Sequence, residues 1–224
     1  MWNWLRRITD RKSRPTSRSP LAFNELKPRI EQLLELDLST DEARNAHGDE
    51  VLSTLRDLDA DIERVRELAN GYPRGPISGD VWMTGAGYGS LSAALTQHFA
   101  KSGWLEHETN ASALWAKATL AVNAHYHHLV GPAMNANADC HMRLGDIERA
   151  TDLWSGVVKD FLFLLHDFDE TPEGPNDEER LALESLRGAI AGIRGTAHAT
   201  HDEFDLPELQ RKVEAVLARP TSDT

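Results

Sequence analysis

The sequence predicts an all-α protein built of antiparallel helical hairpins, with seven or eight helices. Hydrophobic residues recur at gaps of three and four over most of the chain, which is the spacing of one helix face. Glycines and prolines fall between these periodic stretches, where they end helices or form turns. No pair of alternating segments joined by a tight turn indicates a β-hairpin.

The chain has 224 residues, enough for one domain with a sizeable core. We expect a basic flexible arm over residues 1–20, a single helical domain over 21–218 and a disordered tail over 219–224. The arm carries six Arg or Lys and one Asp, a balance of +5. Since the whole chain carries −12, the remainder carries −17. Such an acidic body argues against nucleic-acid binding and favours basic partners.

The single cysteine, Cys140, rules out an intramolecular disulfide and fits a reducing compartment, so we expect a cytoplasmic location. No apolar run reaches the ~20 residues that span a bilayer. The arm interleaves hydrophobic with basic residues, as in a membrane-surface helix or an organelle transit peptide. We favour a tail whose tryptophans dock on the body of the protein, because isolated helices this short are marginal. The arm's hydrophobic residues are Trp2, Trp4, Leu5 and Ile8.

The first helix is expected from Ser19-Pro20, with an apolar stripe from Phe23 to Leu34. Ser39-Thr40-Asp41-Glu42 reads as a capping box for the next helix, which Gly48 is expected to break. A heptad seam follows, and residues 71–79 form the longest loop. The seam comprises Val51, Leu55, Leu58, Ile62, Val65 and Ala69.

The middle of the chain predicts two more helices before the central hairpin. One runs from Ser90 and ends at Gly103. The other runs from about Asn110 to Leu129, with Leu129 facing inward, and is stopped by Gly131-Pro132.

Residues 133–168 predict a helix, a tight turn and a second helix. The first helix is rich in small residues, which allow close packing. Gly145 suits a left-handed C-cap and Asp146 suits the following N-cap. The second helix is strongly apolar on one face: Ala150, Leu153, Trp154, Val157, Val158, Phe161, Leu164, Leu165 and Phe168.

This hairpin resembles a tetratricopeptide-type repeat in Ala138, Gly145-Asp146, Ala150 and Trp154. It departs from the family at His141, where a Tyr is usual, and it has no clear second copy at a fixed period. The resemblance covers about one sixth of the chain. It implies a helical scaffold, often a protein-binding one, and assigns no site residues.

Two further helices complete the prediction. Asn176, followed by three acidic residues, starts one of them, with negative charge at the positive end of the helix dipole. The last helix begins near Asp205-Leu206-Pro207-Glu208 and runs to Leu217.

From this scaffold we expect protein or peptide binding without catalysis, as in an adaptor, regulator or inhibitor. We expect no cofactor and no metal. The residues placed on or beside the central hairpin, where a partner could bind, are His125, His128, His141 and Trp154. The same four residues could equally belong to the core.

One alternative is an S-adenosylmethionine- or nucleotide-using enzyme. Gly85, Gly87 and Gly89 follow a short apolar segment and precede a predicted helix, an arrangement similar to a cofactor-binding loop. Glu106 lies where a ribose-binding acid would be expected. The segments that should form parallel strands read as helices, however, and a lone glycine-rich loop is weak support.

The other alternative is a metal-binding helical bundle. His125 and His128 are three residues apart, as are His198 and His201, and helical bundles assemble metal sites from such pairs. No HExxH or CxxC motif occurs, and hydrogen-bonded core histidines are the commoner explanation of the pattern.

Overall fold

We describe the protein from a computed structural model, which places residues 23–70, 79–122, 127–170, 173–196 and 204–221. These residues form eight α-helices and no strand, so the predicted fold class is confirmed. The helices are α2 (Phe23–Glu35), α3 (Asp41–Asn70), α4 (Gly79–Ser102), α5 (Leu105–Val122), α6 (His127–Arg143), α7 (Ile147–Glu170), α8 (Asp177–Gly195) and α9 (Leu206–Leu217).

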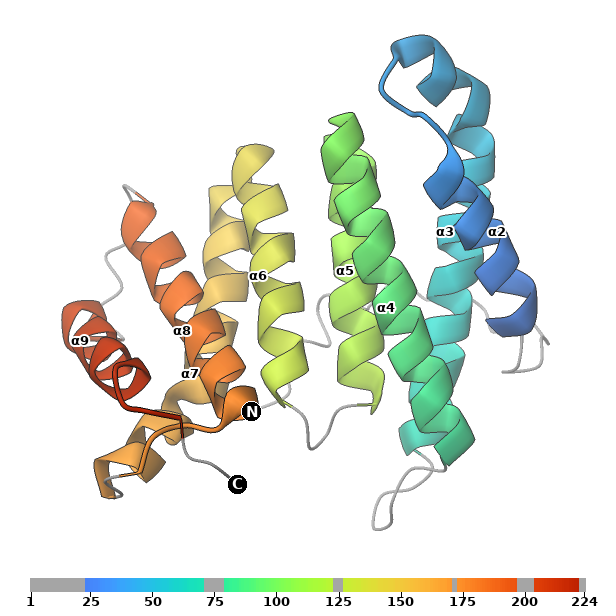
Figure 1. The fold of residues 1–224 in the computed structure, drawn as a ribbon. Coiled ribbons are helices and arrows are strands. Elements are labelled where there is room, and N and C mark those ends of the chain that lie inside the picture. The colour runs from blue at the N-terminus through green and yellow to red at the C-terminus, as the bar shows by residue number, and fades with distance from the viewer. Residues whose placement is uncertain (1–22, 71–78, 123–126, 171–172, 197–203, 222–224) are drawn as a thin grey trace.

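Successive helices pair into antiparallel hairpins that stand side by side in a row (Figure 1). In this view α2, α4, α6 and α8 form a front layer, while α3, α5 and α7 lie behind them. Because the chain reverses within each hairpin, α4, α6 and α8 all begin along the lower edge of the row, as Figure 1 draws it. α4 packs on α5 and α5 packs on α6, so α5 joins the two halves of the row.

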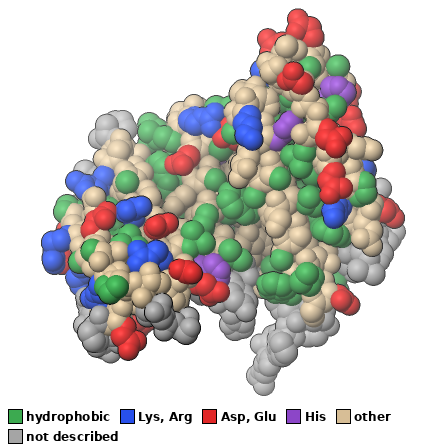
Figure 2. Space-filling view, in the orientation of Figure 1, with side chains coloured by type: hydrophobic (Ala, Val, Ile, Leu, Met, Phe, Trp, Pro, Cys, Tyr) green, Lys and Arg blue, Asp and Glu red, His purple; other side chains and the backbone are tan. Residues whose placement is uncertain are grey.

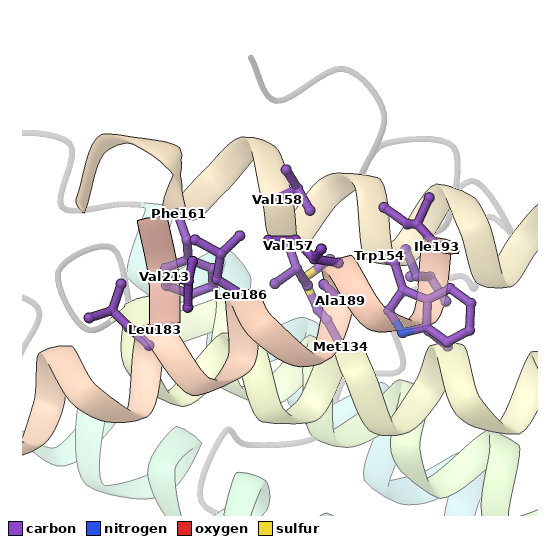
Figure 3. Close-up of a cluster of buried hydrophobic side chains, with 14 of the residues drawn as sticks. Met134, Trp154, Val157, Val158, Phe161, Leu183, Leu186, Ala189, Ile193 and Val213 are labelled. Carbon is purple, nitrogen blue, oxygen red and sulfur yellow. The ribbon is translucent and has the colours of Figure 1, made fainter. Parts of the chain in front are cut away.

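Two hydrophobic cores meet at α5. The N-terminal core lies among α2, α3, α4 and α5, and its fully buried members include Leu58, Tyr88 and Phe99. The C-terminal core lies mainly among α6, α7, α8 and α9 (Figure 3). In that close-up Trp154 and Phe161 of α7 point toward α8.

Two of the turns have the same geometry. Gly103 and Gly145 both have positive φ values, 69° and 79°. The amide of the residue after each glycine bonds five residues back, Trp104 to Phe99 and Asp146 to His141. This double-bonded Schellman turn needs a left-handed residue, which glycine supplies at low steric cost. The predicted Gly145 turn is confirmed, and Gly103 provides a matching turn one hairpin earlier.

Several predicted helix ends are wrong. At Gly131 the reason is that glycine serves packing between helices rather than termination. Gly131 and Pro132 lie inside α6, and a Cβ at Gly131 would come within 2.5 Å of the Ser185 Cβ of α8. Gly48 lies within α3 and does not break it, since a long helix tolerates the ~1 kcal/mol cost of one glycine. The helix expected from Ser90 already begins at Gly79.

The chain ends are only partly covered by the structure. The basic arm lies outside the described residues, and so does most of the predicted loop at 71–79. The tail expected from residue 219 is described as far as Thr221, where it is held against the body. The Arg219 guanidinium donates to the Phe168 carbonyl at 3.1 Å, and Arg180 donates to the Arg219 carbonyl at 3.2 Å.

Candidate binding surface

The front layer exposes large hydrophobic side chains where its helices begin. Met83, the fifth residue of α4, is 63% exposed. Leu129, the third residue of α6, is 41% exposed, and Leu181, the fifth residue of α8, is 38% exposed. We call these three side chains the first-turn surface, since each lies within the first two turns of its helix. In Figure 2, hydrophobic side chains are scattered among polar and charged ones over this view of the molecule.

The first-turn surface has a partly acidic border. Asp80 is exposed beside Met83, and Asp177 and Glu184 are exposed on α8. Glu178 of α8 lies 3.7 Å from the His128 ring of α6, and its side chain is 65% exposed. Exposed hydrophobic groups bordered by carboxylates suit a partner that carries both hydrophobic and basic side chains.

The sequence did not identify this surface. Leu129 was expected to face inward, which is wrong: it is the third residue of α6, which begins at His127, and its side chain is 41% exposed. One signal was available at Met83. Val81, Trp82 and Met83 are consecutive, and neighbours on a helix point about 100° apart, so three large hydrophobic residues in a row cannot all face one core.

Of the four residues predicted for partner binding, the three that the structure describes do not form one site. His125 lies outside the described residues. His128 and His141 lie near opposite ends of α6, about 20 Å apart along the axis at 1.5 Å per residue. His141 Nδ1 is 3.2 Å from Asp146, and burial lowers the pKa of His141, with Asp146 opposing that shift. Trp154 is 4% exposed and belongs to the C-terminal core.

The glycines predicted for a cofactor loop lie within α4, so that expectation is wrong. Their role is close helix packing. A Cβ at Gly85 would overlap the Val122 side chain of α5, and one at Gly87 would lie 2.6 Å from the Phe23 ring of α2. Gly89 is also buried in the helix, and Glu106 lies exposed in the first turn of α5.

No group of three or more potential metal ligands converges in the described part of the chain. Of the two histidine pairs, only His128 is described, and its ring lies 3.7 Å from the Glu178 carboxylate. His125, His198 and His201 fall outside the placed residues.

Polar side chains fill the upper part of the junction between α5 and α6. Glu108 is 5% exposed, and its Oε1 accepts hydrogen bonds from Arg143 at 2.5 Å and from the Cys140 thiol at 3.5 Å. Asn137 donates to Ser112 at 2.9 Å. Burial raises the pKa of Cys140 to about 11, so this sulfur is a neutral thiol near pH 7 and a poor nucleophile.

His107 and Trp104 lie at the same end of α5. Their ring centroids are 3.8 Å apart, and His107 is 5% exposed. Neither ring nitrogen of His107 has a hydrogen-bond partner among the described residues. Burial lowers the pKa of His107, and the nearby Glu106 opposes that shift. A neutral imidazole therefore packs here as part of the N-terminal half.

No family model matches this chain, and neither a curated protein nor a solved structure matches it. Within the placed residues, no helix is both long enough and apolar enough to cross a membrane.

Proposed function

We propose that this chain is a non-catalytic helical scaffold that binds a protein segment through the first-turn surface. The observation that carries the proposal is the position of Met83, Leu129 and Leu181. Three helices of the front layer each expose a large hydrophobic side chain within their first two turns. All three helices begin along the lower edge of the row in Figure 1. Single exposed hydrophobic residues are ordinary, whereas exposed hydrophobic side chains near the starts of three helices of one layer favour a shared use.

The chemistry around this surface defines the kind of partner. Asp80, Glu178 and Glu184 border the hydrophobic side chains, and the body of the protein is strongly acidic. The fitting partner is a protein segment in which hydrophobic and basic side chains alternate along a helix. We also propose that residues 133–168 form a tetratricopeptide-like hairpin and that the protein is cytoplasmic.

The test is a selection of ~20-residue segments from a peptide display library. Winning peptides are then titrated by fluorescence anisotropy into the wild type and into the triple variant Met83→Asp, Leu129→Asp, Leu181→Asp. We expect the triple variant to bind at least about tenfold more weakly, a loss of about 1.4 kcal/mol.

A matched control carries Leu144→Asp and Phe163→Asp, which change two other exposed hydrophobic side chains. It should bind like the wild type. Equal losses in the two variants, or winning peptides without basic residues, would contradict the proposal.

A further inference from the structure

The chain carries a segment with the chemistry that the first-turn surface fits. Residues 1–20 hold Trp2, Trp4, Leu5 and Ile8 among six basic residues. With a balance of +5, this arm is opposite in sign to the body, which carries −17. Attraction between a basic segment and an acidic surface adds to the burial of its apolar side chains.

The arm joins the body at the edge of the same surface. Phe23 is the first residue of α2, and its ring covers Gly87 of α4. Met83 lies four residues before Gly87, so it occupies the same face of α4 one turn closer to the start of the helix. The chain therefore enters the body beside the face of α4 that carries Met83, the most exposed large hydrophobic side chain described.

The packing leaves Met83 uncovered for a simple reason. α2 begins at Phe23 over Gly87, so the first turns of α4 extend past the start of α2. Val81 and Trp82 in those turns are half-buried against the N-terminal core, whereas Met83 is 63% exposed. Residues 1–22 directly precede Phe23, whose ring lies on Gly87, one helical turn from Met83.

From these observations we infer that the N-terminal arm of this chain binds its own first-turn surface at Met83 and competes there with the partner segment. The inference rests on the proposed function for the identity of the surface. An intramolecular ligand has a high effective concentration, so even a weak contact limits access by a separate partner. Loss of the arm's positive charge would then open the surface.

The test places the photoreactive residue p-benzoylphenylalanine at position 83 of the full-length chain. After irradiation, mass spectrometry identifies the crosslinked segments. We expect crosslinks from position 83 to residues 1–20, at least about tenfold more abundant than crosslinks from the same probe at Leu144. Leu144 directly follows the C-terminal end of α6, whereas Met83 lies near the N-terminal end of α4. Replacing Arg6, Arg7, Arg11 and Lys12 by Glu should reduce them by a similar factor.

A mixture of isotope-labelled and unlabelled chains separates contacts within a chain from those between chains. Crosslinks within one chain support the inference. Crosslinks only between chains, equal yields from both probe positions, or insensitivity to the charge reversal would overturn it. If the display peptides bind at Met83 while the arm does not crosslink there, this inference fails and the proposed function stands.

Discussion

The α4–α5 and α6–α7 hairpins close with the same turn, but each joins the next hairpin in a different way. Nine residues after its turn glycine, α5 carries Ser112, which is hydrogen bonded to Asn137 of α6. The equivalent residue of α7 is Trp154, whose indole lies against Gly192 of α8. The α5–α6 junction is polar. At the α7–α8 junction a large ring packs against a glycine, where there is no side chain in the way.

A second pair of positions repeats the contrast. Five residues after each glycine stand Glu108 in α5 and Ala150 in α7, and both are buried. Ala150 lets its neighbours approach, whereas Glu108 reaches Arg143 and Cys140 of the following helix. The same local turn is therefore compatible with either a polar or an apolar junction to the next helix. The two junctions should respond differently to mutation.

The largest effect is expected at the apolar junction. Trp154→Ala should lower the free energy of unfolding by about 3–5 kcal/mol, because it removes a buried ring and leaves a cavity. Gly192→Ala should cost about 1–3 kcal/mol, since the new methyl overlaps that ring. Urea denaturation measures both. Gly195→Ala, where a Cβ meets nothing within 4 Å, is the control and should not destabilise. An unchanged free energy of unfolding in Gly192→Ala would show that the Trp154 ring is free to move.

The polar junction should respond asymmetrically. Arg143→Ala leaves the buried Glu108 carboxylate without its cation and should cost about 1–3 kcal/mol. Glu108→Leu removes the buried charge and leaves an arginine whose side chain is 49% exposed, so it should cost less. Adding Glu108→Leu to Arg143→Ala should restore stability. A double-mutant cycle in urea tests this, and simple additivity would show that the pair is not coupled.

A smaller, pH-dependent effect is expected at His107. Since burial lowers its pKa from the ordinary 6.5, the unfolded chain binds this proton at a higher pH than the folded chain. His107 therefore leaves the free energy of unfolding unchanged above about pH 6.5 and lowers it as the pH drops below that value. His107→Phe should keep the stacking on Trp104 and lose less stability between pH 7 and pH 5.

His98 and His141 share the direction of the His107 shift, so some acid sensitivity should persist in His107→Phe. Replacement of the exposed His166 by Gln is the control. Parallel pH profiles for the wild type and His107→Phe would show that this ring takes no part.

The smallest effect concerns chemistry rather than stability. Cys140 is 1% exposed and its pKa is raised to about 11, so a disulfide reagent at pH 7.5 should label it only when the fold opens. The labelling rate should rise in Arg143→Ala, which weakens the surrounding junction, and not in Gly195→Ala. Fast labelling in the native wild type would mean that α5 and α6 are not closed around the thiol.

The sequence predicted those features that depend on neighbouring residues. The Gly145 turn, the Asn176 N-cap of α8 and the proline near the start of α9 are all local signals, and the structure contains each of them. A heptad seam in α3 is equally local, and Val51 to Val65 of that seam are buried.

Glycines that serve long-range packing could not be recognised in the same way. Gly85, Gly87 and Gly131 have no Cβ because another helix passes close by, and a sequence does not say which helix that is. The same limit applied to Trp154, whose Gly192 partner lies one helix further along. The first-turn surface could not be predicted from the sequence, because the exposure of an apolar residue depends on where the neighbouring helices begin and end.

The shared position of α5 has a consequence for how the molecule opens. Ala116 belongs to the C-terminal core, whereas Ala118, two residues later, belongs to the N-terminal core. Each core is held mainly by helices that do not contribute to the other, so the row resembles a one-dimensional chain of nearest-neighbour couplings. Native-state hydrogen exchange should then resolve two cooperative units, and the weaker of the two would set the rate of proteolysis and turnover.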